Sequence, residues 1–451
     1  IMGGGLLQLV AYGAQDVYLT GNPQITFFKI VYRRHTNFAM ESIEQSFNGN
    51  PVIGSRVSVL ITRNGDLINR VYFRGTLKNT NTSTGLALVP FYGIRLLKNV
   101  ELEIGGQRID KHYSEWMYIW NELSLPIGKR DGYNAMVGGN SNNRSIILDK
   151  EESKDICVPL EFWFCRNVGL ALPLIALQYH EVKINIEFAS KHEMCDTNIY
   201  NFSVNKTSNN SDFTSNDLEL DSPQLYVDYI FLDTDERRKF AQLSHEYLIE
   251  QLQFTGSEKI DGSTVNTSLK NIRINFNHPC KELIWTIKPE NITTSSDGQV
   301  ISDINNSVDG LNIIDDGNSG SLTRAYWNNF SNDSYNRYGY TVKSGIIKNP
   351  VLAAKLQLNG NDRFAQRVGD YFSIVQPYQH HENTPKNVGI NVFSFALKPE
   401  EHQPSGTLNM SRIDTAHLQV ASSKSGLISI YAINYNVLRI LSGMGGLAYS
   451  N

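Results

Sequence analysis

Short runs of β-branched and aromatic residues recur along the chain and are separated by Gly, Asn, Asp and Pro. This pattern is typical of strands joined by turns. The clearest case is RVSVLITRNGDLINRVYF at 56–73, where Asn64-Gly65 predicts a tight hairpin turn because both residues tolerate the positive φ angles that such a turn requires. Three further segments predict strands in the same way: LEFWF (160–164), YHEVKINIEF (179–188) and GLISIYAINYNVLRI (426–440). The fold is therefore predicted to be mainly β.

Helical spacing of apolar residues is rare and occurs at two places. In YSEWMYIWNEL (113–123), five apolar side chains fall on one face of a helix: Tyr113, Trp116, Met117, Trp120 and Leu123. A weaker pattern in DTDERRKFAQ (233–242) begins at Asp233, whose side chain can cap the first turn. Both segments are predicted to be short helices.

Three long segments are poor in apolar residues and rich in Asn, Ser, Thr, Asp and Gly. They are about 128–155, 191–222 and 289–345. Segments of this composition cannot bury a core, and long loops in a compact domain are usually functional or mobile. We predict that all three are surface loops.

The order of the predicted elements repeats once along the chain. VELEIGGQRIDKHYSEWMYI (100–119) matches AKLQLNGNDRFAQRVGDYFSI (354–374), since each has a strand, a Gly-containing turn and an acidic-aromatic start to a helix. Further on, LEFWFCR, LPLIAL and YHEVKI follow one another in the same order as VFSFALK, GTLNMSRI and AHLQV. Each match is weak alone, but their shared order favours two copies of one β unit. Two such units of about 200 residues each predict paired sandwiches of jelly-roll type.

Composition narrows the class of protein. A chain of 451 residues, 41% of them hydrophobic, can fill two cores. With a formal net charge of −4, the chain lacks the positive field typical of nucleic-acid-binding proteins. The longest apolar run, Val168–Leu177, is too short to span a bilayer, and no signal peptide is expected, so a soluble protein is predicted. The four cysteines form no CxxC pair and are predicted to be free thiols in a reducing compartment.

No motif predicts catalysis, a cofactor or a metal ion. His245-Glu246 resembles half of a zinc-protease helix, but Ile249 stands where the second histidine is required. GMGGLA (443–448) fits a dinucleotide fingerprint, yet too few residues follow it to form the helix that binds the pyrophosphate. Two clusters contain residue types that bind metals. They are His192, Glu193, Cys195 and Asp196, and His380-His381-Glu382. Polar loops are the simpler interpretation of both clusters. A carboxylate pair of the glycosidase kind stays open, because acidic residues are plentiful.

Residues 20–38 (TGNPQITFFKIVYRRHTNF) mix basic and aromatic side chains. This combination can bind a phosphate backbone and stack on bases. The alternation that follows the turn Gly21-Asn22-Pro23 also predicts a strand. In a slightly acidic protein we favour a polar sheet face or a protein interface.

Seven segments together resemble the major capsid proteins of the nucleocytoplasmic large DNA viruses, most closely those of viruses of algae and other protists. The segments, which cover essentially the whole chain, are 6–43, 63–68, 172–188, 232–253, 276–285, 394–414 and 431–451. The resemblance implies an all-β fold of two consecutive eight-stranded jelly-roll sandwiches with short helices and long surface loops. It also implies a structural protein without catalytic residues or cofactors, whose trimers have a pseudo-hexagonal outline and tile an icosahedral shell.

The resemblance also assigns parts of the chain to roles. It implies an N-terminal arm (1–24), a first jelly roll (25–222) that begins with the strand Ile25–Arg34, and a second jelly roll (223–451). Six residues become candidates for arm or assembly contacts: Gly3, Gly4, Gly5, Lys29, Arg33 and Arg34. The polar segments become outward loops. Four Asn-x-Ser/Thr sequons in the longest of them are candidates for glycosylation, although the sequons alone predict little about modification: Asn291, Asn305, Asn329 and Asn332.

The implied partners are two further copies in a homotrimer, neighbouring trimers, minor capsid proteins and, indirectly, the inner viral membrane, with no specific nucleic acid. The implied location is the virion capsid, and the resemblance implies that the protein is made and assembled in the host cytoplasm. Two other functions stay open from the residues alone. A β-sandwich protein can bind or cleave carbohydrate, because fold does not fix function. Nucleic-acid binding by residues 20–38 would predict an affinity that falls steeply with salt.

Overall fold

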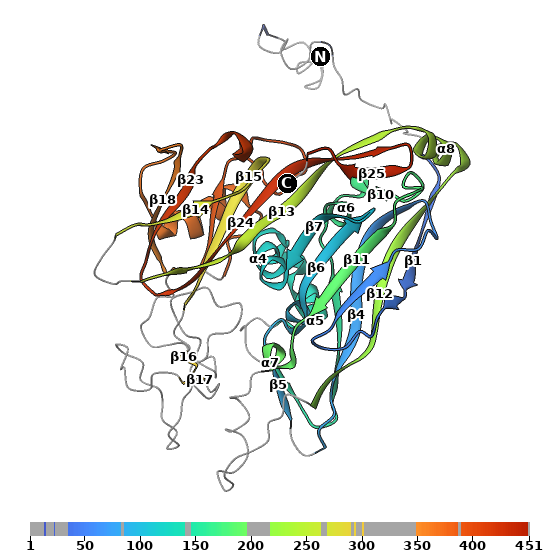
Figure 1. Cartoon of the computed structure of the whole chain (residues 1–451), viewed down its shortest axis with the longest axis horizontal. Helices are drawn as coiled ribbons and strands as arrows, with labels where there is room; N and C mark the ends of the chain where they lie inside the picture. Colours follow the sequence, from blue (N-terminus) through green and yellow to red (C-terminus); the bar gives the residue numbers. More distant parts are fainter. Residues whose placement is uncertain are drawn as a thin grey trace, which may run out of the picture. The chain divides into compact units, whose positions relative to one another are not determined.

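The structure is a computed structural model of the chain. It describes residues 13–14, 22, 35–82, 85–139, 146–195, 217–262, 268–289, 293–294, 300–301, 349–386 and 389–449. Internal contacts divide the chain into two units, Ile1–Phe38 and Ala39–Asn451. The account below concerns the second unit, whose described part is built mainly from four antiparallel sheets of five or six strands (Figure 1).

The first two sheets form one sandwich, called here the first roll. β12 lies between β1 and β4 in one sheet, where β9 and β10 also pair with β4; β11 lies between β3 and β6 in the other, with β2 and β7 at its edges. Along β4 buried positions alternate with more exposed ones, because one face of the sheet packs on the core, where Phe73 meets Phe188 of the opposite sheet. The strands are β1 (Phe38–Gln45), β2 (Phe47–Asn48), β3 (Arg56–Leu60), β4 (Leu67–Asn79), β6 (Leu97–Ile104), β7 (Gln107–Tyr113), β9 (Ser153–Pro159), β10 (Leu172–Pro173), β11 (Val182–Phe188) and β12 (Leu218–Leu232).

The other two sheets form a second sandwich, the second roll. β24 lies between β13 and β15 in one sheet, with β21 beyond β15, and β23 lies between β14 and β18 in the other. β22 pairs with β15, β25 with β24, and β19 and β20 with β18. The strands are β13 (His245–Ile260), β14 (Lys270–Ile274), β15 (Pro279–Pro289), β18 (Val351–Leu358), β19 (Asn361–Asp362), β20 (Arg367–Val368), β21 (Ile390–Ser394), β22 (Leu408–Asn409), β23 (Ala416–Ser422), β24 (Gly426–Leu441) and β25 (Met444–Leu447).

The two rolls have the same strand order. The sheet order β1, β12, β4, β9 in the first roll recurs as β13, β24, β15, β21 in the second. The order β3, β11, β6, β7 recurs as β14, β23, β18 and then β19 with β20. Each roll therefore has the eight strand positions of a jelly roll, and the corresponding strands follow in the same order along the chain. The predicted all-β double jelly roll is confirmed, together with the duplication from which it was inferred.

Short helices and two small two-stranded sheets complete the described elements. The two predicted helices are confirmed: α4 covers the segment that begins at Ser114, and α8 follows Asp233, whose carboxylate accepts a hydrogen bond from the Thr234 N–H. The helices are α3 (Tyr92–Leu96), α4 (Ser114–Ser124), α5 (Ile127–Val137), α6 (Trp163–Arg166), η1 (Val168–Leu170), α7 (Lys191–Met194), α8 (Thr234–Gln242), the π-helix η4 (Tyr371–Val375), α9 (Gln376–His380) and η5 (Met410–Arg412). The small sheets pair β5 (Leu86–Leu88) with β8 (Ile146–Leu148), and β16 (Thr293–Thr294) with β17 (Val300–Ile301).

The predicted hairpin at Asn64-Gly65 is wrong. β3 and β4 belong to different sheets, and neither residue has a positive φ angle. The chain here crosses from one sheet of the sandwich to the other. Gly65 is required for a different reason, because a Cβ atom at this position would lie 2.8 Å from Cβ of Tyr229.

The polar segments are only partly loops. Residues 128–155 include most of α5, whose Tyr133 and Val137 are buried, and the start of β9. Residues 191–222 include α7 and the start of β12. A polar composition hid these elements because few apolar side chains suffice to hold a short helix against a core. Most of 289–345 lies outside the described residues.

Several predicted positions also lie outside the described residues. They are the strand Ile25–Arg34, the contact residues Gly3, Gly4, Gly5, Lys29, Arg33 and Arg34, and the glycosylation sites Asn291, Asn305, Asn329 and Asn332. The four cysteines are free thiols, as predicted. Among the described helices, none combines the length and apolar character needed to cross a membrane.

Candidate assembly surfaces

Helix α4 of the first roll packs on the outer face of the second roll. The Trp116 ring lies 5.5 Å from that of Tyr431 on β24. Beside it, Oε1 of Glu115 lies 3.3 Å from Nζ of Lys288 on β15, and the Tyr431 hydroxyl donates to Glu115 at 3.4 Å. Trp120 stacks on Trp116 one turn further along the helix. This face of α4 is therefore an aromatic surface with an ion pair at its edge.

Strand β7 extends the same contact between the rolls. The Tyr113 ring meets Phe254 of β13 edge to face at 5.0 Å. The Gln251 side chain donates to the carbonyl of Ile109, and the Leu252 N–H donates to Asp110 at 3.1 Å. The two rolls are thus joined by apolar packing and by hydrogen bonds from β13.

Because this contact covers its outer face, β24 of the second-roll sheet is buried on both faces. Every residue of β24 from Ile428 to Asn436 is buried. Side chains on one face, such as Trp285, belong to the core of the second roll, whereas Tyr431 and Ile433 belong to the core that continues into the first roll. The outer face of β24 is therefore part of the hydrophobic core of the first roll.

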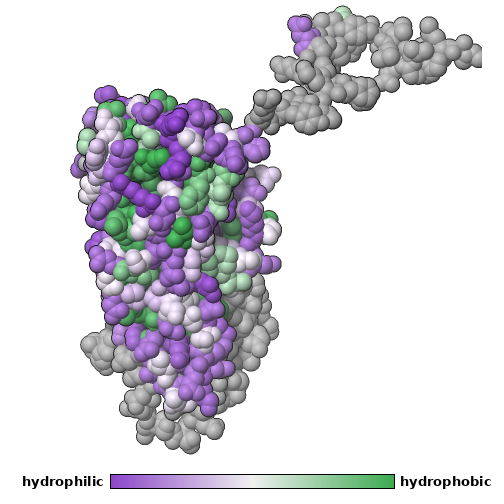
Figure 2. All heavy atoms as spheres, turned by 90° about the vertical axis from the view of Figure 1, so that its right-hand side faces the viewer, coloured by the Kyte–Doolittle hydropathy of each residue, from purple (hydrophilic) through white to green (hydrophobic). Residues whose placement is uncertain are grey.

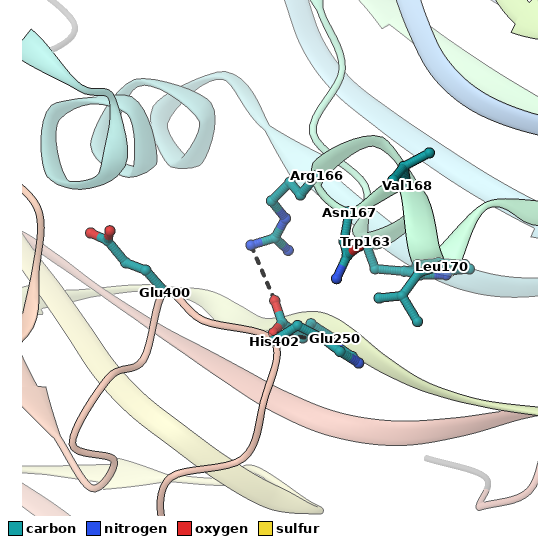
Figure 3. A pocket seen from close by; sticks show the side chains of 8 residues that line it. All are labelled: Trp163, Arg166, Asn167, Val168, Leu170, Glu250, Glu400 and His402. Carbon is teal, nitrogen blue, oxygen red and sulfur yellow. Dashed lines mark ion pairs between the residues drawn. The ribbon is translucent and has the colours of Figure 1, made fainter. Parts of the chain in front are cut away.

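A buried ionic cluster lies beside this contact. Glu250 on β13 pairs with Arg166 of α6 at 3.2 Å (Figure 3). It also pairs with Lys281 on β15 at 2.7 Å. The Lys281 ammonium, 1% exposed, also donates to the carbonyl of Glu401 at 2.9 Å and lies over the Tyr435 ring. Burial alone would raise the pKa of Glu250, but Arg166 and the other cationic neighbours lower it to about 2. The cluster fixes α6 of the first roll to β13 of the second.

A cavity of about 340 Å³ opens beside the cluster. Its lining comes from both rolls: Trp163, Arg166, Asn167, Val168, Leu170, Glu250, Glu400 and His402. The carboxylate of Glu250 that faces it is already neutralised by Arg166 and Lys281. We interpret the cavity as a gap in the packing between the rolls.

His381 holds a second ionic contact in the second roll. Its Nε2 lies 2.9 Å from Glu282, and its Nδ1 lies 2.8 Å from Glu400. Burial alone would lower the pKa of His381, but the carboxylates of Glu282 and Glu400 raise it to about 9. The imidazolium therefore bridges β15 to the segment after β21 at neutral pH.

The clusters with metal-binding residue types have other partners. His381 is bound as described above, and Glu193 accepts from Ser190 in a capping box and pairs with Arg95. His245 contacts the carbonyl of Phe240. Within the described residues, no three His, Cys, Asp or Glu side chains are grouped so that they could hold a metal ion. Asp196 lies outside the described residues.

In the second roll, the helix that corresponds to α4 has an exposed apolar face. η4 and α9 follow one another and are called here the second-roll helix. Phe372 and Gln376 are buried against the roll. On the opposite side, Ile374, Val375 and Tyr378 are 46%, 38% and 79% exposed. Apolar residues grouped on a surface in this way mark interaction sites.

In the first roll, none of the described helices or strands covers the outer face of the sheet that corresponds to the buried one. Buried positions alternate with half-buried ones along β12 from Leu225 onward. Tyr226 stacks on Tyr72 of β4 at 5.3 Å, and Ser42 of β1 bonds to the Tyr72 hydroxyl. Met40, two residues before Ser42, points to the same side and is 48% exposed. We call this surface the first-roll sheet face. It lies on the right in Figure 1, the side seen in Figure 2, where hydrophobic residues gather among polar ones in the upper half.

Comparison with known proteins identifies the family. Residues 26–233 match the family "Major capsid protein N-terminus", and residues 236–446 match the family "Large eukaryotic DNA virus major capsid protein". The chain belongs to the major capsid protein family of large eukaryotic DNA viruses. The major capsid proteins of Pyramimonas orientalis virus and Paramecium bursaria Chlorella virus 1 are 49% and 45% identical to it over the full length of both chains.

Solved structures agree with this assignment. The capsid protein superposes on a chain of the quasi-atomic model of the PBCV-1 virus capsid with a TM-score of 0.72 and 41% identity, covering 94% of this chain and 100% of that chain. The Faustovirus major capsid protein shares the fold, with a TM-score of 0.68 at 14% identity, covering 95% of this chain and 94% of that chain. The predicted family and the predicted structural, non-enzymatic role are confirmed, and the protein is a component of the virion capsid.

The residues that join the rolls were not predicted from the sequence. Trp116 and Trp120 were placed on a helix face, but nothing showed that the second roll would cover them. Glu250, Lys281 and Arg166 lie far apart along the chain, and no motif links them. One signal was available: the repeat aligns the start of α4 with the start of the second-roll helix, so the two helices could have been compared for what covers each.

Proposed function

We propose that this capsid protein forms a homotrimeric capsomer and that its trimers tile an icosahedral virus shell. The observation that carries the proposal is the unequal cover of the two corresponding helices. α4 is covered by the second roll of the same chain, whereas Ile374, Val375 and Tyr378 of the second-roll helix are exposed. A further copy of the chain would supply the missing cover.

Such contacts would be heterologous, because the helix of one copy would meet a different surface on the next. Heterologous contacts close into a ring when the rotation between copies allows it. Three chains would place six similar rolls around the axis, which supports the pseudo-hexagonal outline that the family resemblance implies.

The remaining partners belong to the same proposal. Neighbouring trimers, minor capsid proteins and, indirectly, the inner viral membrane would contact the outside of the ring, and assembly would take place in the host cytoplasm. The division into an arm (1–24) and two rolls is part of the proposal. Pairing of β12 with β4 up to Ile230 supports a boundary after Leu232 rather than between residues 222 and 223.

Light scattering of the purified full chain, over a wide range of concentrations, tests the proposal. We expect a species near three times the chain mass of 50.8 kDa that persists on dilution. Electron microscopy of concentrated samples should then show larger shells or sheets of trimers. A chain that stays monomeric at every concentration would contradict the trimer, and glycan binding would be the function to measure next.

A further inference from the structure

We propose that the second-roll helix of one copy docks on the first-roll sheet face of the next copy, with Asp370 paired to Arg74 across the contact. The inference rests on the proposed homotrimer and names the two surfaces that form it. It follows from a contact that the chain already makes within itself.

The two helices present the same positions to solvent or to a partner. The sequence repeat aligns Glu115-Trp116 with Asp370-Tyr371, and the same register then aligns Trp120 with Val375. On the side that faces each helix's own roll, Met117 and Phe372 correspond and are both buried, which supports this register. The second-roll helix therefore presents the same side to its own roll as α4 does.

The exposed face of the second-roll helix matches the covered face of α4. Trp120, which stacks on Trp116 and lies under the Arg166 guanidinium beside the contact between the rolls, is 4% exposed, whereas Val375 at the corresponding position is 38% exposed. Ile374 and Tyr378 extend the exposed face by one helical turn. A surface of this kind excludes water only when another surface covers it.

The first-roll sheet face has the features of the surface that receives α4. In the second roll that surface is centred on the stacked rings of Phe254 and Tyr431, 4.6 Å apart. On the first-roll sheet face, Tyr72 and Tyr226 form a similar stack at 5.3 Å. Tyr431 and Tyr226 lie on corresponding strands, β24 and β12. Met40 adds exposed apolar area beside the stack.

Charges on the two open surfaces are complementary. Within the chain, Glu115 at the start of α4 pairs with Lys288 on β15. Asp370 takes the place of Glu115 and is exposed. On β4, which corresponds to β15, Arg74 lies next to Tyr72 on the outward side and is also exposed. The Asp370 carboxylate of one copy can therefore meet the Arg74 guanidinium of the next at the edge of the aromatic contact.

Charge reversal tests the pairing in the full chain. In low salt, D370R and R74D should each raise the concentration at which half of the trimer dissociates by about tenfold or more, because like charges then face each other in all three contacts. The double variant D370R/R74D should recover most of the loss. The control D370R/R70D moves the reversed charge to an exposed arginine on the same side of β4, beyond Tyr72, and should recover much less.

Cysteine cross-linking gives a second measurement that does not depend on the strength of an ion pair. Trp116 meets Tyr431 within the chain, so the contact between copies should bring Tyr371 to Tyr226. With a short bismaleimide, the double variant Y371C/Y226C should form covalent trimers on a denaturing gel. Each single variant and the wild type, with its four native cysteines, should not.

The outcomes separate this inference from the proposed function. A wild-type chain that does not trimerise contradicts the homotrimer itself. A wild-type trimer with neither charge rescue nor cross-linked trimers contradicts the docking of these two surfaces and leaves the trimer intact. Rescue by the matched pair, together with the cross-link, supports the docking.

Discussion

The two rolls share one strand order but have different surroundings. In the second roll, β24 is buried on both faces because α4 and β7 cover its outer side. In the first roll, the corresponding strand β12 alternates between buried and half-buried positions. The helices show the reverse pattern. The first-roll helix α4 is covered, whereas the second-roll helix has an exposed apolar face. A duplicated chain thus contains one completed contact and one pair of open surfaces of the same kind.

The contact between the rolls also contains buried ion pairs. Arg166 of the first roll reaches Glu250 in the second, and Lys281 is fully buried beside it. Buried ion pairs fix orientation, although their net contribution to stability can be small, because desolvation opposes the attraction. We infer that this cluster sets the angle between the rolls, while the aromatic contact supplies most of the stability.

The largest expected effect comes from truncating the covered helix face. W120A should lower the unfolding free energy of the isolated subunit by about 3–5 kcal/mol, because it removes a buried indole. V375A, at the corresponding exposed position, should change it by about 0.5 kcal/mol or less. Urea unfolding at concentrations where the chain is monomeric measures both. Equal losses in the two variants would mean that the helices have similar surroundings, contrary to the comparison above.

An intermediate effect is expected from alkaline pH. The pKa of His381 is raised to about 9 from its ordinary value of 6.5, so the folded state binds a proton that the unfolded state releases earlier. The stability from this proton is fully present below pH 6.5 and is lost as pH rises to about 9. The loss should be about 3 kcal/mol in the unfolding free energy.

Unfolding measured at several pH values between 6 and 9.5 tests this dependence. H381Q should be less stable at neutral pH, because Glu282 loses its charged partner, and its profile over this range should be flatter than that of the wild type. A slope in H381Q as steep as in the wild type would assign the dependence to another group.

The smallest effect is expected in the connection between the rolls. Asp233 caps α8, which joins β12 to β13, by accepting from the Thr234 N–H at 2.7 Å. D233A should lower the unfolding free energy by about 1 kcal/mol. The control D235A, in the first turn of the same helix, should cost only a few tenths, about 0.3 kcal/mol. Losses of the same size would show that Asp233 acts through its charge and not as a cap.

The sequence predicted the elements that depend on local pattern. It failed for elements whose structure depends on pairing with strands distant in the chain. α4 and α8 followed from spacing and a cap, and the repeat predicted the duplication. Asn64-Gly65 has the local signal of a hairpin, but β3 and β4 each pair with strands much later in the chain, and those ladders outweigh the turn preference. α5 was missed because its apolar side chains are few.

The joint between the rolls could not be predicted for a related reason. Lys281 and Glu250 carry no motif, and their pairing depends on β13 and β15 lying on either side of β24. His381 was singled out as part of a polar cluster, but its partners Glu282 and Glu400 become neighbours only in the folded second roll. Side-chain pairs of this kind follow from topology, which a single sequence encodes only weakly.

The short connection through α8 also sets how the completed contact depends on protein concentration. Because α8 ties the two rolls together, α4 meets the second roll at an effective concentration on the order of millimolar, however dilute the protein is. A contact of the second-roll helix with another chain has no such tether. If the second-roll helix docks on another chain as proposed, that contact is populated only when the chain concentration approaches its dissociation constant.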